Sequence, residues 1–244
     1  MQDHLKALVQ HTYALGNIDL VKITGTQDET LINTISEDRS VILEAKFKTA
    51  HPDFIGTFGM PNLGKLKTIL GIEEYKEDAK ITITTQKDSD GNDVPSGINF
   101  ENKTGDFKNN YRFMAAEHVT EKAKAVKFKG VNWHIEFEPT VAAIQRLKMQ
   151  ASANAEELTF QAKTENGQLK FFFGDHSTHA GNFVFQPDVT GTLKRAWAWP
   201  IKTVISILDL TGDKTFKISD DGAAMITVDS GLATYNYILP AQSK

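Results

Sequence analysis

The sequence predicts an α+β fold made of four copies of one unit, a helix followed by an antiparallel β-hairpin. Apolar residues recur every three or four positions in four segments, and the period changes to two directly after each segment. Prolines or glycines stand at the ends of these segments, as helix-capping physics requires. The predicted helices begin near residues 2, 61, 139 and 200, at intervals of roughly 60, 80 and 60 residues. This spacing indicates two halves with two units each.

The third copy, residues 138–173, shows the pattern most clearly. Its helix opens at Pro139, because proline is tolerated in the first helical turn. Arg146 points away from the apolar stripe of this helix and Lys148 flanks it. The residues expected to face the core are Val141, Ile144, Leu147 and Ala151 in the helix, followed by Leu158, Phe160 and Ala162 in the next strand. Asn166-Gly167 then favours a tight hairpin turn.

The other copies follow the same scheme. The first helix, residues 2–15, ends at Gly16, and its histidines, His4 and His11, are expected at the surface. Its predicted inward residues are Leu5, Leu8, Val9, Thr12 and Leu15. Strands are expected at residues 18–24, 30–36, 39–47 and 53–58. The second helix runs from Pro61 to Gly71, a polar excursion follows at residues 84–110, and Tyr111–Met114 forms an edge strand. The fourth helix begins at Pro200 and ends before Gly212.

The apolar period breaks down in residues 115–129, which are small and charged. Such a composition is typical of a linker. The sequence therefore predicts an N-terminal domain at residues 1–117, a linker at 118–130 and a C-terminal domain at 131–244.

Composition and charge limit the classes of function. The 244 residues include no cysteine, which excludes disulfides and thiolate zinc sites and suits a reducing cytoplasm. No basic leader with an apolar run and no stretch of 18 apolar residues is present, so no membrane span is expected. The net charge is −4, but the four predicted helices sum to +3 and the remainder to −7. Basic helices on an acidic body either face a polyanion or simply solvate the surface.

Two segments resemble catalytic or nucleotide-binding motifs. Residues 59–65 fit G-x-x-x-x-G-K, but Leu66 stands where a magnesium-binding Ser or Thr belongs, and Pro61 removes an N–H from the loop. A helix is the better interpretation there. Asp175, His176 and His179 could form a metal or hydrolytic site, although no nucleophile-elbow pattern surrounds Ser177. A solvated loop is expected instead, and no catalytic residue, metal or cofactor is predicted.

Several stretches together resemble a known family. They are VKITG at 21–25, VILEAKF at 41–47, PNLGKLKTILGI before EDAKITI at 61–83, EPTVAAIQRL before EELTFQAKTENGQLKF at 138–171, and FKISDDGAAMITVDSGLATYNYIL at 216–239. The pattern resembles a DNA sliding clamp, the polymerase processivity factor, and is most similar to the clamps of T-even-type bacteriophages. This resemblance covers nearly the whole chain.

The resemblance implies a homotrimeric ring with helices inside, sheets outside and duplex DNA in the hole. Such a clamp catalyses nothing, needs no cofactor, and tethers a DNA polymerase after a clamp loader places it on DNA. It would work in the cytoplasm of an infected bacterial host. The basic residues that lie off the apolar stripes, and so are expected to face DNA, are Lys6, Lys65, Lys67, Arg146, Lys148 and Lys202.

The family also implies an apolar pocket for partner peptides near the linker and the C-terminal strand. The corresponding positions here are Val119, Val126, Ile238, Leu239, Pro240 and Ala241. Two other classes stay open at this point. One is an enzyme with a metal-dependent or hydrolytic site near Asp175, His176 and His179, and the other is a phage structural protein of duplicated β-rich domains.

Overall fold

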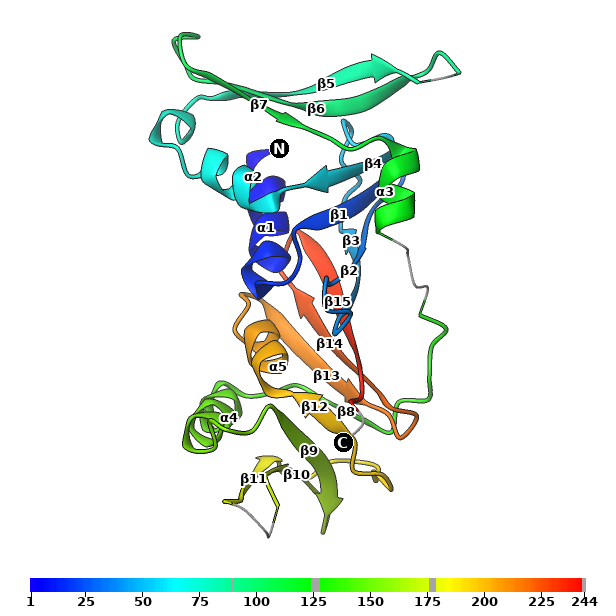
Figure 1. The fold of residues 1–244 in the computed structure, drawn as a ribbon, viewed down its shortest axis with the longest axis vertical. Coiled ribbons are helices and arrows are strands. Elements are labelled where there is room, and N and C mark those ends of the chain that lie inside the picture. The colour runs from blue at the N-terminus through cyan, green and yellow to red at the C-terminus, as the bar shows by residue number, and fades with distance from the viewer. Residues whose placement is uncertain (89, 124–127, 176–178, 243–244) are drawn as a thin grey trace. The chain divides into compact units, whose positions relative to one another are not determined.

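The structure is a computed structural model that describes residues 1–88, 90–123, 128–175 and 179–242 (Figure 1). The chain divides into two compact units. The first comprises Met1–Arg39, Leu43–Val126 and Ser230–Tyr235, and the second comprises Ser40–Ile42, Lys127–Asp229 and Asn236–Lys244. Each unit combines helices with antiparallel strands, so the predicted α+β class is confirmed.

The first unit contains helices, a group of four paired strands and a separate three-stranded sheet. Its elements are α1 (Gln2–His11), η1 (Tyr13–Leu15), β1 (Leu20–Gly25), β2 (Thr30–Ile35), β3 (Ile42–Phe47), β4 (Gly56–Pro61), α2 (Leu63–Leu70), η2 (Glu73–Tyr75), β5 (Lys80–Lys87), β6 (Asp93–Glu101), β7 (Lys108–Arg112) and α3 (Ala116–Lys122). The strand orders are β4-β1-β2-β3 and β5-β6-β7. Buried and half-buried side chains alternate along β1 and β2, which gives each strand one face toward the core.

Three boundaries in this unit differ from the prediction. The first helix ends at His11, and the residues before Gly16 form a separate 3-10 turn that Gly16 closes with φ 85°. Pro61 does not start the second helix; it is the last residue of β4 and pairs with Leu20. The helix begins two residues later, after Asn62, whose φ is 55°. Proline is compatible with this strand end because the lost N–H lies at the limit of the ladder.

The second unit repeats the scheme. Its elements are β8 (Ile135–Phe137), α4 (Val141–Ala153), β9 (Thr159–Glu165), β10 (Gln168–Phe173), β11 (Gly181–Gln186), β12 (Ala198–Pro200), α5 (Ile201–Leu208), β13 (Asp213–Ile218), β14 (Ala223–Asp229) and β15 (Ala233–Pro240), of which Ala233–Tyr235 are grouped with the first unit. The strand orders are β11-β10-β9-β12 and β15-β14-β13-β8. Phenylalanines on facing strands build the core, for example Phe160 stacked on Phe171 with centroids 4.2 Å apart.

Two predicted core residues of this unit are exposed. Val141 and Leu158 each retain 75% of their accessible surface. The Thr140 hydroxyl caps α4 by accepting a hydrogen bond from the Ala143 N–H, so Val141 is the first helical residue. The buried stripe of α4 is Ala143, Ile144 and Leu147, and Val141 lies off its centre. Leu158 directly precedes β9 and stands outside its side-chain alternation.

The segment predicted as a linker contains a helix in its first part. α3 places Val119 fully buried against β4, where a Cβ on Gly59 would approach the Val119 Cγ2 to 2.7 Å. The polar stretch 84–110, expected as a surface excursion within a hairpin, forms that hairpin with a third strand beside it. It includes the end of β5, all of β6 and most of β7, with a tight turn at Asp88–Asn92.

Two histidines pack inside the first unit: His11, which was expected at the surface, and His51, for which no position was predicted. His11 is 2% exposed and stacks on Tyr235 at 4.6 Å between ring centroids. His51 is 5% exposed and stacks on Phe54, with the His4 ring 5.2 Å away. Burial, helped by the positive charges of His4 and the amino terminus, lowers the pKa of His51 to about 4, against a smaller opposing effect of Asp53.

We predict that acid destabilises the protein through His51. Because its pKa is about 4 when folded and about 6.5 when unfolded, the unfolded chain takes up a proton first as the pH falls. Stability should fall between pH 6.5 and 4, by up to about 3 kcal/mol at about 1.4 kcal/mol per pKa unit. Urea unfolding of His51→Gln should show a flatter pH dependence over this range. His118→Gln, at an exposed position, is the matched control, and equal pH slopes for both variants would contradict the assignment.

Candidate nucleic-acid interface

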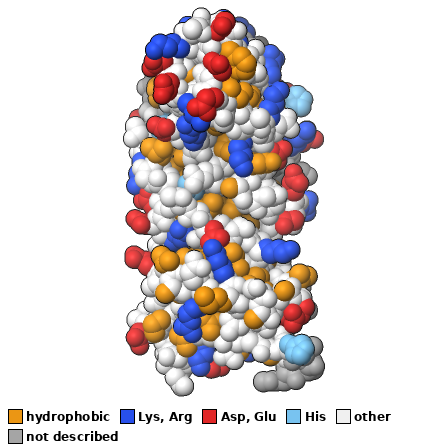
Figure 2. All heavy atoms as spheres, turned by 90° about the vertical axis from the view of Figure 1, so that its left-hand side faces the viewer, with side chains coloured by type: hydrophobic (Ala, Val, Ile, Leu, Met, Phe, Trp, Pro, Cys, Tyr) orange, Lys and Arg blue, Asp and Glu red, His pale blue; other side chains and the backbone are white. Residues whose placement is uncertain are grey.

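The two helices of the first unit carry basic side chains opposite their buried stripes. Leu5, Leu8 and Val9 of α1 and Leu63, Leu66, Ile69 and Leu70 of α2 face the core. Lys6, Lys65 and Lys67 are exposed, as predicted from the helical period. Figure 2 views the helix side of this unit and shows basic side chains interspersed with apolar and acidic ones.

Contacts with neighbouring side chains fix the position of α2. Tyr13 lies across α2 at Gly64, where a Cβ would come within 2.8 Å of the tyrosine hydroxyl oxygen. The Lys67 Nζ lies 5.6 Å from the centroid of the same ring, a cation–π distance. The Asp19 carboxylate accepts a hydrogen bond from the Gly64 N–H at 3.2 Å, and the Tyr111 hydroxyl donates to the Pro61 carbonyl. Asp19 therefore supplies the N-terminal cap that the Asn62 side chain does not.

The basic residues of the second unit are engaged differently. Lys148 forms an ion pair with Asp209 at 2.5 Å, which joins α4 to the end of α5. Arg146 donates to the Val184 carbonyl at 3.2 Å, and its guanidinium lies 5.3 Å from the Phe183 ring centroid. Lys202 is exposed on α5. All six predicted cations therefore lie on helices, but Lys67, Arg146 and Lys148 already hold partners within the chain.

The predicted partner pocket is only partly accessible. Val119, Ile238 and Leu239 are 0–2% exposed, so within this chain their side chains belong to the core, and their contact with a partner stays a prediction. The reason is that Val119 packs on β4, whereas Ile238 and Leu239 lie within β15. Pro240 is exposed and Ala241 is half-buried. Val126 lies outside the described residues.

The accessible residues at the C-terminal end adjoin an aromatic side chain. The Ala241 N–H donates to the Gly222 carbonyl at 2.9 Å. A Cβ on Gly222 would lie 3.5 Å from the ring of Trp197 and 3.6 Å from Ala241. Trp197 is half-buried, and the Arg195 guanidinium lies 5.8 Å from its ring centroid. The half-buried ring of Trp197 therefore adds apolar surface beside the C-terminal end of β15.

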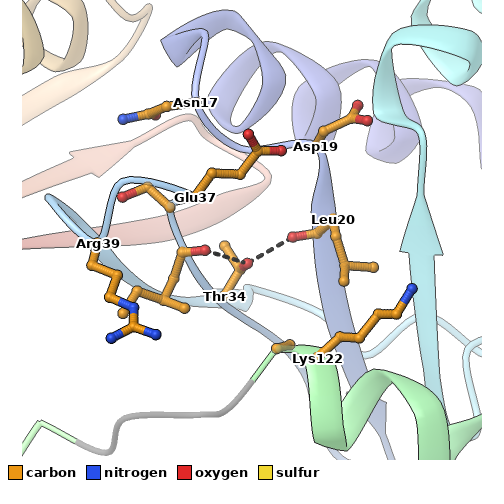
Figure 3. A pocket seen from close by; sticks show the side chains of 10 residues that line it. Asn17, Asp19, Leu20, Thr34, Glu37, Arg39 and Lys122 are labelled. Carbon is orange, nitrogen blue, oxygen red and sulfur yellow. Dashed lines mark hydrogen bonds between the residues drawn. The ribbon is translucent and has the colours of Figure 1, made fainter.

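A polar cavity of about 510 Å³ in the first unit also escaped prediction (Figure 3). Residues from the start of β1, from β2 and the turn after it, and from α3 surround it: Asn17, Asp19, Leu20, Thr34, Glu37, Arg39 and Lys122. The Thr34 hydroxyl donates to the Leu20 carbonyl at 2.6 Å. Carboxylates and cations are mixed around this cavity, so its charge selects no single ligand class. No local pattern signals a site that residues so far apart in sequence build together.

Within the described residues, the structure gives no geometric support to the two segments that resemble nucleotide-binding or catalytic motifs. Gly59, Met60 and Pro61 pair with β1 in a strand ladder, so residues 59–65 do not form a phosphate-binding loop. Asp175 and His179 are exposed, while His176 and Ser177 lie outside the described residues. Across the described part of the chain, no three His, Asp or Glu side chains gather where they could hold a metal ion. None of the described helices has the length and apolar character needed to cross a membrane.

Comparison with known proteins gives matches among solved structures alone. No protein-family model and no curated protein sequence matches the chain. A structure of A. fulgidus PCNA with the C-terminal region of FEN-1 bound matches with a TM-score of 0.72 and 9% identity, covering 100% of this chain and 97% of that one. The chain has a sliding-clamp fold.

Two further clamp structures agree with this result. PCNA from Thermococcus kodakaraensis matches with a TM-score of 0.66 and 10% identity, over 99% of this chain and 97% of that chain. Proliferating Cellular Nuclear Antigen from Entamoeba histolytica matches with a TM-score of 0.67 and 10% identity, over 98% and 94%. The expected sliding-clamp fold is thus confirmed over the whole length, while the special closeness to T-even-type phage clamps stays a prediction.

We predict that the Asp19 cap holds α2 in place. Asp19→Ala removes the acceptor for the Gly64 N–H and should lower the free energy of unfolding by about 1 kcal/mol, typical for a lost cap. Asp19→Asn keeps an oxygen acceptor and should lose less. Chemical denaturation of the two variants measures the difference, and equal stabilities for Asp19→Ala and the unchanged chain would contradict this role.

Proposed function

We propose that the protein is a DNA sliding clamp, a ring that encircles duplex DNA and tethers a polymerase without catalysing a reaction. The observation that carries the proposal is the match to PCNA over 97–100% of both chains. A tether works by raising the effective concentration of the polymerase at the primer end, so it needs neither an active site nor a cofactor. The enzyme alternative is not favoured by the exposed positions of Asp175 and His179.

The helix faces suit a sliding contact. Lys6, Lys65, Lys67 and Lys202 are exposed on helices, and Arg146 and Lys148 add two further cations. Flexible cations that reach phosphates give binding that depends on salt and not on base sequence. That is the contact a clamp needs, because base-specific hydrogen bonds would stop it at particular sites.

Free sheet edges suit closure into a ring of three copies. Among the described strands, β7 ends the order β5-β6-β7 and β11 ends the order β11-β10-β9-β12. Unpaired edges invite pairing with another chain. Pairing of β7 from one copy with β11 from the next is head-to-tail, and such an interface forms a ring when its rotation closes. Met149, 68% exposed on the helix that packs on β11, would gain burial there.

Partner proteins would bind near the C-terminal end of β15. Pro240, Ala241 and the half-buried Trp197 offer accessible apolar surface. The contact of Val126 with a partner stays a prediction, because this residue lies outside the described ones. The A. fulgidus PCNA structure holds the C-terminal region of FEN-1, so a protein of this fold captures a terminal segment of another protein. By analogy a polymerase and a clamp loader would dock here, in the cytoplasm of an infected bacterium. We also propose the expected division of the chain into an N-terminal domain at residues 1–117, a linker at 118–130 and a C-terminal domain at 131–244.

The proposal predicts processive synthesis that depends on DNA topology. With the polymerase and loader of the same genome, the chain should lengthen the products made on a primed circular template by about tenfold or more, because the tethered polymerase rebinds faster than it diffuses away. On a linear template with free ends the ring slides off, so the gain should be lost. Product lengths that do not respond to the chain on either template would contradict the proposal.

A further inference from the structure

We infer that the free edge of β5, in the three-stranded sheet of the first unit, is a docking site for an extended segment of another protein (Figure 1). The segment would add a fourth strand beside β5 and would carry apolar residues alternating with polar or acidic ones. This inference goes beyond the proposed function, because it concerns neither the helix faces nor the C-terminal end of β15. It also does not depend on closure into a ring, for which we propose other strands.

The edge of β5 is long and open. The strand spans eight residues and pairs on one side only, with β6. Within the described residues, no other strand and no backbone hydrogen bond from another segment lies on its outer side. Every second residue of such an edge directs its N–H and C=O groups to solvent. A row of free backbone donors and acceptors is the feature that an added strand recognises.

The hydrogen bonds of β6 show how the backbone of β5 is oriented. The Phe113 N–H, just after β7, donates to the Ser96 carbonyl of β6 at 2.9 Å. The N–H of Gly97 belongs to the same peptide group as this carbonyl, so it points the opposite way, to β5. The partner of Gly97 on β5 is Thr84. Thr84 therefore directs its backbone groups to β6.

Ile81 and Ile83 carry free backbone groups of β5. Thr82 and Thr84 direct theirs to β6, and the direction alternates along a strand, so the two isoleucines direct theirs to the open edge. Their side chains lie on the same face of the sheet as the buried Ile98 of β6, yet they remain only half-buried. An added strand would satisfy these backbone groups and cover the two side chains at once.

The second unit shows what covers the equivalent edge. β13, like β5, follows the second helix of its unit and begins a hairpin, and β8 lies on its outer side. Phe216 and Ile218 of β13 are 0% and 1% exposed. They lie opposite Phe137 and Ile135 of β8, with the two phenylalanine ring centroids 5.4 Å apart. β5 has no such cover in the described residues, so its isoleucines stay half-buried.

β8 also indicates the chemistry of the strand that would cover β5. Between its two buried residues stands Glu136, which lies opposite Lys217 and forms an ion pair with it at 3.1 Å. Lys80 at the start of β5 is exposed, and no ion pair of this lysine is found in the described part of the chain. A segment with apolar residues opposite Ile81 and Ile83 and an acidic residue opposite Lys80 would repeat the arrangement of β8.

A second copy of this chain fits the edge less well than a partner segment does. Antiparallel pairing of β5 with β5 over its whole length would place Lys80 of each copy opposite Lys87 of the other. Like charges at opposite positions destabilise a strand pair, and lysines on an edge strand oppose self-association. We therefore assign the edge to an extended segment of alternating apolar and acidic character.

Disulfide trapping tests the inference, because the 244 residues include no cysteine. The probe is a synthetic peptide of residues 133–139 of this chain, which contains β8, with Glu136→Cys. Thr82→Cys places a thiol on β5. Asn110→Cys is the matched control, because this residue is equally exposed and lies in the same row of the sheet at its other edge. A second peptide has the same composition but no alternation, with its isoleucine and phenylalanine side by side.

Intact mass in a glutathione buffer measures the fraction of mixed disulfide for each peptide. At Thr82→Cys the alternating peptide should be trapped about tenfold more than the second peptide, as expected from a few favourable cross-strand pairs. At Asn110→Cys the two peptides should be trapped about equally. Comparison of the peptides at one cysteine removes any difference in accessibility between the two positions.

Hydrogen exchange gives a second test without any substitution in the chain. With the Glu136 form of the peptide at about ten times its Kd, the Ile81 and Ile83 amides should exchange about tenfold more slowly. The Thr82 and Thr84 amides, which already bond to β6, should keep their rates. Equal trapping of the two peptides at Thr82→Cys, or isoleucine amides that exchange as fast with the peptide as without it, would overturn the inference and leave the clamp proposal standing.

Discussion

The structure depends on the burial of one stripe of each helix against the apolar face of a β-sheet. Leu5 and Leu8 of α1 and Ala143, Ile144 and Leu147 of α4 provide that stripe, and the strands supply alternating side chains to meet it. Burying one side of a helix leaves the other side for solvent. In this chain that side carries lysines and an arginine, so the packing that stabilises the fold also places positive charge at the surface of the helices.

The second constraint on the structure is that the edge strands of each sheet need a partner for their free backbone groups. A bridge from Met114 to Gly59 covers part of the free edge of β4, and a bridge from Gln242 to Ala198 does the same for β12. In both units the residues just after the last strand thus close an internal edge. Four strands end a strand order without such cover in the described residues, namely β5, β7, β8 and β11. Of these we propose β7 and β11 for the contacts between copies. Closure into a ring would pair such an edge with an edge of the next copy, so that no additional strand is needed to cover it.

Local patterns predicted much of this architecture because periodicity and capping act over a few residues. The four main helices, the hairpins and the exposure of Lys6, Lys65 and Lys67 follow from such patterns. Features that depend on residues far apart in sequence were not predicted. Nothing near Val119 in sequence indicates that Gly59 leaves room for it, and nothing near Pro61 indicates the pairing with Leu20 that keeps it in a strand. A helical wheel likewise does not predict the ion pair between Lys148 and Asp209, which are 61 positions apart in sequence.

The central proposal is that copies of this chain close into a ring of three, because a closed ring stays on DNA by its topology and needs no base-specific contact. Native mass spectrometry from dilute ammonium acetate measures this directly. The account predicts one dominant species at about three times the chain mass of 27.1 kDa, seen as rings in electron micrographs. A species at the mass of one chain over the whole micromolar range, with no rings, would contradict it.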